Sequence, residues 1–147
     1  MRIRRYHLAV AMLVAALGLV ATVVYAQGQD GTKVLDQWKT SVQHSKFSQN
    51  YSNLKEITSH LQHVMNCIEG ARGSGYDGGV GNPCQGQGSG MITDAKTAGG
   101  KYTQAVPLFE LADEIAATGL KSKSVEKSKT AGWAAQMVLE RVGDTLR

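Results

Sequence analysis

An apolar seam that steps alternately by three and four residues constrains the fold more than any other feature. It consists of Leu54, Ile57, Leu61, Val64 and Ile68. Side chains at this spacing share one face of an α-helix, so the segment must bury that face against other elements. Asn53, followed three positions later by Glu56, fits a helix start, and Gly70 fits a helix end, because glycine adopts the left-handed conformation without strain.

Helical patterns also occur before and after this segment, and no stretch shows the alternation of a β-strand. The first helix is predicted from Thr32 to about Gln49, and its apolar face is formed by Leu35, Trp38 and Val42. A third helix should begin near Pro107, because proline suits a first helical turn, and should end at Gly119. Its predicted apolar stripe is Leu108, Leu111, Ala112 and Ile115, with Asp113 and Glu114 on the solvated surface.

The last predicted helix runs from about Ser122 to Leu146. Its seam is Val125, Ser128, Ala131, Ala135, Val138, Val142 and Leu146, with Trp133 and Met137 alongside. Four amphipathic helices and no strands indicate an all-α protein. We therefore predict a four-helix bundle in a single domain, residues 27–147.

Residues 70–100 separate the two helical pairs and hold 11 of the 17 glycines. No apolar periodicity is visible there, so we predict a long glycine-rich crossover loop between the second and third helices. A loop of this length in a small domain is uncommon and calls for a reason, either mobility or function. Cys84 in its middle favours a loop that is tethered at that point.

Residues 1–26 have the anatomy of a secretory signal peptide. Arg2, Arg4 and Arg5 precede an apolar run of 17 residues, Leu8–Val24, and small residues precede the expected cleavage point. A retained membrane anchor is the alternative, although the run is slightly short for it. We expect an exported protein, periplasmic or secreted, that meets a membrane only through an uncleaved leader or by peripheral contact.

Removing the leader nearly cancels the net charge of the chain. The whole sequence has 16 basic and 12 acidic residues, or +4, and three of the basic residues lie in the leader. The mature chain therefore has 13 against 12, or +1. Nucleic-acid binding depends on many phosphate contacts, so a near-neutral exported protein is a poor candidate for it.

The chain contains two cysteines, and in an exported protein a single pair usually forms a disulfide. A bond between Cys67 and Cys84 would close a loop of about 18 residues and contribute about 3 kcal/mol through chain entropy.

His60, His63 and Cys67 lie within a sector of about 60° on the predicted second helix, at the flank of its apolar seam. These residue types suit zinc or copper, with a fourth ligand such as Met91 or Asp77 from the loop. A disulfide at Cys67 would leave only the two histidines. Met65 points away from His63, which excludes that pair as ligands of one ion.

Haem and enzyme interpretations find less support in the sequence. Covalent haem attachment requires C-x-x-C-H, which neither cysteine provides. A b-type haem would need an inward histidine and a partner such as Met137. The segment Gly86–Gly90 contains fragments of phosphate-binding and nucleophile motifs but follows no strand, so we predict no catalytic residues. No cofactor is predicted, although a metal or b-type haem stays possible.

Two surfaces could contact a partner. Loops on rigid scaffolds commonly carry binding residues, and the loop offers Tyr76, Asp77, Asn82 and Gln85. A basic patch near the start of the last helix consists of Lys121, Lys123, Lys127 and Lys129. It is either a solvated face or a docking patch for an acidic partner or anionic headgroups.

Two short motifs carry a resemblance. H-V-x-N-C at His63–Cys67 and G-N-P-C-x-G-x-G at Gly81–Gly88 flank part of the glycine loop. The stretch from about 54 to 120 resembles small secreted bacterial helical proteins of unassigned function. The resemblance implies an exported helical protein and provides no catalytic or ligand residues.

The sequence therefore predicts an exported, disulfide-stapled helical protein. We interpret it as a non-catalytic binding or accessory subunit, in contact with a protein partner in the cell envelope. The alternative is a metal- or haem-binding electron-transfer protein that uses His60 and His63.

Overall fold

The computed structural model describes residues 30–146, and the expected leader lies outside them. A first helix occupies residues 30–50 of the described part. It is followed by α2 (Leu54–Glu69), the short 3-10 helix η1 (Gly78–Val80), α3 (Met91–Ala98), α4 (Gly100–Lys121) and α5 (Val125–Leu146). Over residues 30–146 there is no strand, so the all-α prediction is confirmed for this part of the chain.

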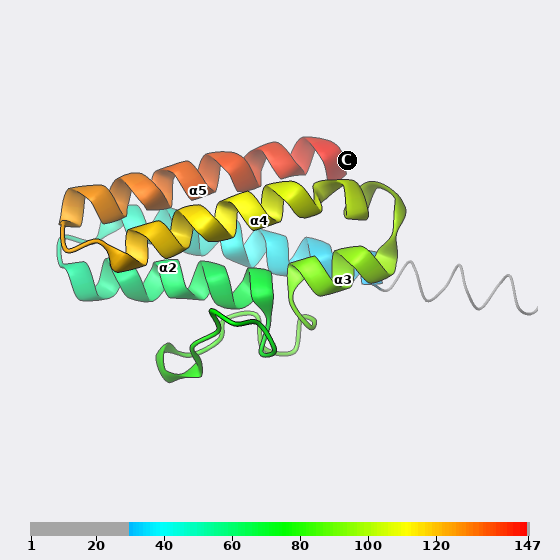
Figure 1. Cartoon of the computed structure of the whole chain (residues 1–147), viewed down its shortest axis with the longest axis horizontal. Coiled ribbons are helices and arrows are strands. Elements are labelled where there is room, and N and C mark those ends of the chain that lie inside the picture. The colour runs from blue at the N-terminus through cyan, green and yellow to red at the C-terminus, as the bar shows by residue number, and fades with distance from the viewer. Residues whose placement is uncertain (1–29, 147) are drawn as a thin grey trace, which may run out of the picture.

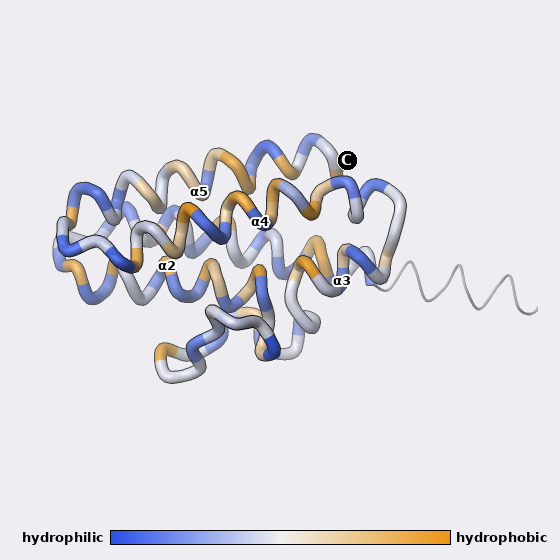
Figure 2. Tube along the Cα trace, viewed as in Figure 1, coloured by the Kyte–Doolittle hydropathy of each residue, from blue (hydrophilic) through white to orange (hydrophobic). Residues whose placement is uncertain are grey.

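The long helices lie lengthwise beside one another, and α3 lies at one end of the assembly (Figure 1). α4 is central, because it packs against α5, α2 and α3. Apolar residues recur along these helices (Figure 2). The largest completely buried apolar side chains are Phe109, Ile57, Leu61, Ile68, Met91 and Leu139.

Both predicted ends of α2 are confirmed. The Asn53 side chain accepts a hydrogen bond from the Glu56 amide at 3.0 Å, and Asn53 Nδ2 donates to Glu56 Oε2 at 2.7 Å. At the other end Gly70 has a φ of 72°. A Cβ at Gly70 would lie 2.0 Å from the carbonyl oxygen of Ser89, so glycine is required for two reasons.

The loop prediction for residues 70–100 is wrong at its C-terminal end, because α3 occupies Met91–Ala98. Only Met91, Asp94, Ala95 and Ala98 of this helix are buried. A single methionine and two alanines give a weak apolar pattern, and the glycines on both sides hide it. The segment between α2 and α3, residues 70–90, contains no α-helix and is called the glycine loop below.

The predicted start and end of the third helix are wrong, and its predicted face is right only in part, since Ala112 is buried and Leu108 packs at the core edge. α4 begins at Gly100, so the exposed Pro107 lies inside the helix and leaves one main-chain carbonyl without its usual N–H donor. The buried face consists of Ala105, Val106, Phe109, Ala112, Ala116 and Gly119. Leu111, predicted to be buried, is 43% exposed.

Gly119 does not end α4 but allows three helices to approach closely. The helix continues to Lys121, and Gly119 is buried. A Cβ at this position would lie 2.7 Å from both Ala131 Cβ on α5 and Leu61 Cδ1 on α2. The glycine is therefore explained by packing.

The predicted seam of α5 is largely confirmed, since Ser128, Ala131, Ala135, Val142 and Leu146 are buried. Leu139, which the prediction omitted, is buried as well. Trp133 and Met137, which were predicted beside the seam, are 54% and 49% exposed. Met137 therefore points away from the interior, where a b-type haem would need it.

The inward face of the first helix is unusually polar. Gln37, Ser41, Ser45 and Ser48 are buried there together with Val34, whereas Leu35, Trp38 and Val42 pack at the edge of the core. Small side chains permit a close approach to α5, because a Cβ at Gly132 would lie 1.9 Å from Ser48 Oγ. Trp38 Nε1 donates to the carbonyl oxygen of Leu139 at 2.7 Å.

Asp113, predicted to be solvated, lies half-buried beside Glu69 at the end of α2. Its Oδ1 has no hydrogen-bond partner, and the Glu69 carboxylate lies near enough to affect its protonation. Burial, followed by the nearby Glu69 charge, raises the pKa of Asp113 to about 7. The folded protein thus holds this proton more tightly than the unfolded chain.

We expect Asp113→Asn to stabilise the protein above pH 7 and to have little effect near pH 4. Because the pKa of Asp113 is higher in the folded than in the unfolded protein, its protonation stabilises the fold. This stabilisation is complete below the ordinary pKa of 3.8 and is lost as the pH rises through about 7. Thermal unfolding of both proteins between pH 4 and 8 measures the difference. A Tm difference that is constant with pH would contradict this assignment.

Gly119→Val should destabilise the fold substantially, because the new side chain must displace Ala131 and Leu61. Overpacking of this kind typically costs about 1–3 kcal/mol. Thr118→Val is a matched control, since Thr118 is the neighbouring position on α4 and its side chain is exposed. Urea unfolding of the two variants should show the larger loss for Gly119→Val.

Candidate metal centre

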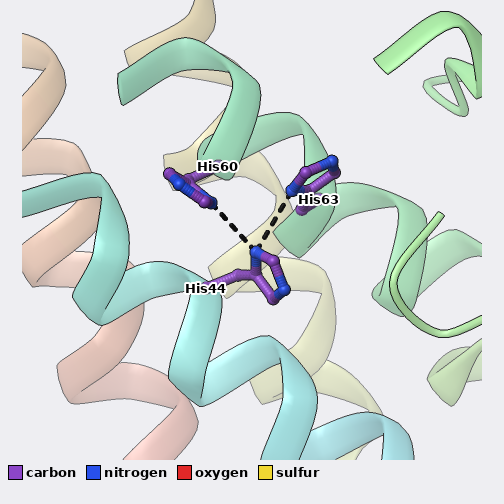
Figure 3. A group of neighbouring side chains, drawn as sticks. All are labelled: His44, His60 and His63. Carbon is purple, nitrogen blue, oxygen red and sulfur yellow. Dashed lines mark hydrogen bonds between the residues drawn. The ribbon is translucent and has the colours of Figure 1, made fainter. Parts of the chain in front are cut away.

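Three histidines from two helices converge at the flank of the molecule (Figure 3). His44 lies on the first helix, and His60 and His63 lie on α2. Nδ1 of His44 is 3.0 Å from Nδ1 of His60 and 3.1 Å from Nδ1 of His63. The chain contains four histidines, so all but His7, which lies outside the described residues, meet at this point.

The helical spacing explains why these side chains meet. His60 and His63 are three residues apart, so they occupy adjacent positions on α2, and both are half-buried. This agrees with their predicted place at the flank of the apolar seam. His44 approaches from the neighbouring helix and points between them (Figure 3).

Aromatic rings line one side of the cluster. Phe47 meets His44 edge-on, with ring centroids 5.5 Å apart, and lies 5.4 Å from His60. Tyr51 stacks on His60 with a centroid distance of 5.1 Å. These contacts restrict the imidazole orientations and reduce their access to water.

The environment favours the neutral form of His44 and His60. Burial, followed by the neighbouring histidines, lowers the pKa of His44 to about 4. Burial is also the largest cause that lowers the pKa of His60. Metal ions bind the neutral ring through a nitrogen lone pair, so both histidines are in the binding form at neutral pH.

A main-chain carbonyl fixes which nitrogen of His63 can bind a metal. His63 Nε2 lies 2.8 Å from the carbonyl oxygen of Val80, which can only accept a hydrogen bond. Nε2 must therefore carry the proton, and Nδ1 of the neutral ring carries the lone pair. This lone pair is on the nitrogen that faces His44.

The nitrogen distances fit coordination of one ion. With zinc–nitrogen bonds of about 2.0–2.1 Å, two tetrahedral ligands lie about 3.3 Å apart. The two pairs that include His44 Nδ1 are 3.0 and 3.1 Å apart, and the ligand atoms of the three histidines all lie within 4.8 Å of one another. A hydrogen bond between two imidazoles needs an N–H on one ring and a lone pair on the other. His44 Nδ1 carries either a proton or a lone pair, so it cannot make a full hydrogen bond with both His60 Nδ1 and His63 Nδ1. A cation that takes all three lone pairs removes this conflict.

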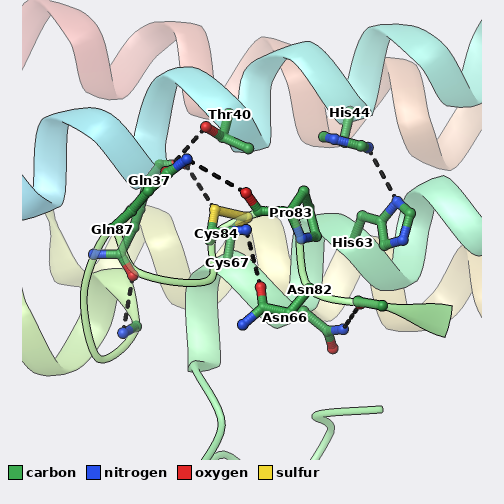
Figure 4. Close-up of a disulfide and its surroundings, with 12 residues drawn as sticks. Gln37, Thr40, His44, His63, Asn66, Cys67, Asn82, Pro83, Cys84 and Gln87 are labelled. Atoms are coloured by element: carbon green, nitrogen blue, oxygen red, sulfur yellow. Dashed lines mark hydrogen bonds between the residues drawn. A yellow bond between two sulfur atoms is a disulfide. The ribbon is translucent and has the colours of Figure 1, made fainter. Parts of the chain in front are cut away.

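The predicted disulfide between Cys67 and Cys84 is confirmed, with a Cα–Cα distance of 5.3 Å (Figure 4). The described residues contain no free cysteine, so Cys67 is not available as a thiolate ligand. The other ligands suggested from the sequence also lie outside the cluster. Met91 is completely buried in the core, and the Asp77 side chain accepts from the Gly79 amide at 2.7 Å.

The predicted contact residues of the glycine loop divide into two kinds. Asp77 and Asn82 support the loop itself, because Asn82 Oδ1 accepts from the Cys84 amide at 3.0 Å and Asp77 caps η1. Tyr76 is half-buried, and Gln85 is exposed. Lys121, Lys123 and Lys127 of the predicted basic patch are exposed, and Lys129 is half-buried. A contact role for these residues stays a prediction.

Searches of family models, of curated proteins and of solved structures found no match to this chain. The disulfide fits an exported protein, since such bonds persist in oxidising compartments. Among the described helices, none combines the length and apolar character needed to cross a bilayer.

Proposed function

We propose that this protein binds one transition-metal ion through His44, His60 and His63 in an oxidising compartment outside the cytoplasm. The observation that carries the proposal is the convergence of three Nδ1 atoms from two helices. The scaffold in this proposal is a four-helix bundle with one crossover, which holds the two helices at a fixed distance.

The donor set selects a class of metal. Imidazole nitrogens suit zinc, copper and nickel, whereas magnesium and calcium prefer oxygen ligands. Over the described residues no other histidine, cysteine or carboxylate joins the three histidines. A tetrahedral ion would therefore keep one position for water or an exchangeable ligand.

Binding or transport of the metal is favoured over haem-based electron transfer. Met137 on α5 is 49% exposed, so it does not offer a haem ligand to the interior. We propose a non-catalytic role for this binding site.

Isothermal titration of Zn²⁺, Ni²⁺ and Cu²⁺ into the oxidised exported chain, purified without a histidine tag, tests the proposal. We expect one ion per chain. Removing a residue that hydrogen-bonds to a metal ligand typically lowers metal affinity about 10–100-fold. Removing a ligand itself should cost more, so we expect a loss of more than about 100-fold for each of His44→Ala, His60→Ala and His63→Ala. Zinc at 100 times its Kd should stabilise the fold by about 2.7 kcal/mol, measurable as a rise in Tm.

Tyr51→Leu is the matched control, because it removes a ring that stacks on His60 without removing a ligand nitrogen. It should retain binding to within several-fold. If the wild-type chain binds none of the three ions, or if the three histidine variants bind as well as wild type, the histidines are a packing cluster and the proposal is wrong.

Exposed apolar side chains favour a second role, as an accessory subunit of a cell-envelope complex. Trp133 and Met137, one turn apart on α5, are 54% and 49% exposed, and Leu111 on α4 is 43% exposed. Large apolar side chains at this exposure are candidates for contact with a partner protein.

A photo-crosslinking residue at position 133 should capture one discrete partner in intact cells. The same residue in place of Lys39, an exposed position on the first helix, serves as the control and should give no such adduct. Equal or absent crosslinking at both positions would contradict the accessory role of this face.

A further inference from the structure

One face of α2 links the histidine cluster to the glycine loop. His63, Asn66 and Cys67 occupy adjacent turns, and each holds a different part of the loop (Figure 4). His63 binds the carbonyl of Val80 at 2.8 Å, and Cys67 is bonded to Cys84. Asn66 lies between these two anchors.

Asn66 is the main polar anchor of the segment that positions Val80. Its Nδ2 donates to the carbonyl oxygens of Asp77 and Gly81, each at 2.8 Å, and its Oδ1 accepts from the Asp77 amide at 3.0 Å. The side chain is completely buried. These bonds hold both ends of η1, and η1 contains Val80.

The contact with Val80 determines how His63 can bind a metal. With Nε2–H committed to the carbonyl, the His63 ring is held with its Nδ1 lone pair toward His44. Without this acceptor, the proton could occupy either nitrogen and the ring could rotate. Partners of this kind orient metal-binding histidines and raise their basicity.

We propose that closure of the glycine loop and metal binding at the three histidines are thermodynamically coupled through the contact between His63 and Val80. The closed loop prepares His63 for the metal, and the bound metal in turn holds the loop closed. Such coupling is reciprocal, so each event must favour the other by the same factor. The inference rests on the proposed metal-binding function and adds its regulation.

The coupling has a functional consequence. The loop carries Tyr76 and Gln85, two of the predicted contact residues. Metal occupancy would therefore control the order of a surface that could be displayed to a partner.

Zinc affinity measured by competition with a chromophoric chelator tests the coupling. Asn66→Leu removes the anchor of η1 and no histidine, and it should lower zinc affinity about 10–100-fold. Gln37→Leu is the matched control. It also removes a buried amide that holds the loop, since Gln37 Oε1 accepts from the Gly90 amide at 2.9 Å, but this bond lies at the far end of the loop. Its zinc affinity should stay within about threefold of wild type.

Hydrogen exchange of the wild-type chain provides a test that does not depend on the folding of any variant. Saturating zinc should slow exchange of the amides in residues 76–84, including Gly81, which donates to the carbonyl of Gly78. The Ser122 amide at the turn after α4 is an internal control and should not change.

The outcomes separate the two proposals. If wild type binds none of Zn²⁺, Ni²⁺ and Cu²⁺, both proposals fail. If wild type binds zinc, and an Asn66→Leu variant that circular dichroism shows to be folded binds zinc equally well, the coupling alone is wrong. Unchanged exchange in residues 76–84 on zinc binding would also overturn the coupling and leave the metal site intact.

Discussion

The packing of α2 against the core, the first helix and the glycine loop is the constraint on which the rest of the structure depends. One face carries Ile57, Leu61, Val64 and Ile68 into the core, and the adjacent flank presents His60 and His63 to the first helix. The disulfide at Cys67 fixes the glycine loop to the same helix. Loop closure costs conformational entropy, and the covalent bond removes much of this cost from the folding equilibrium. A single helix therefore organises the core, the histidine cluster and the loop.

Features encoded by neighbouring residues could be predicted from the sequence. The ends of α2 follow from Asn53 and Gly70, and the disulfide follows from two cysteines in a chain with an expected leader. The position of His60 and His63 follows from helical geometry.

Features that depend on contacts between helices could not be predicted in this way. Pro107 suggested a helix start because sequence alone does not show that its exposed position tolerates proline inside α4. Gly119 suggested a helix end because its contacts with Ala131 and Leu61 are long-range.

His44 was missed for the same reason, although a signal was present. Ser41, Ser45 and Ser48 recur at helical spacing and are buried, and His44 lies beside this small-residue face. The prediction followed the larger side chains Leu35, Trp38 and Val42 instead, which pack at the core edge. Small polar residues that permit close helix packing give little hydrophobic signal. With His44 included, two histidines that could have been surface residues become part of a three-nitrogen cluster in which burial favours the neutral form of His44 and His60.

X-ray absorption at the zinc edge of the loaded, oxidised protein shows whether three imidazole nitrogens of this chain bind one metal ion. We expect three imidazole ligands at about 2.0–2.1 Å, a fourth light atom and no sulfur. A shell that consists only of oxygen, or one with a sulfur scatterer at about 2.3 Å, would contradict it.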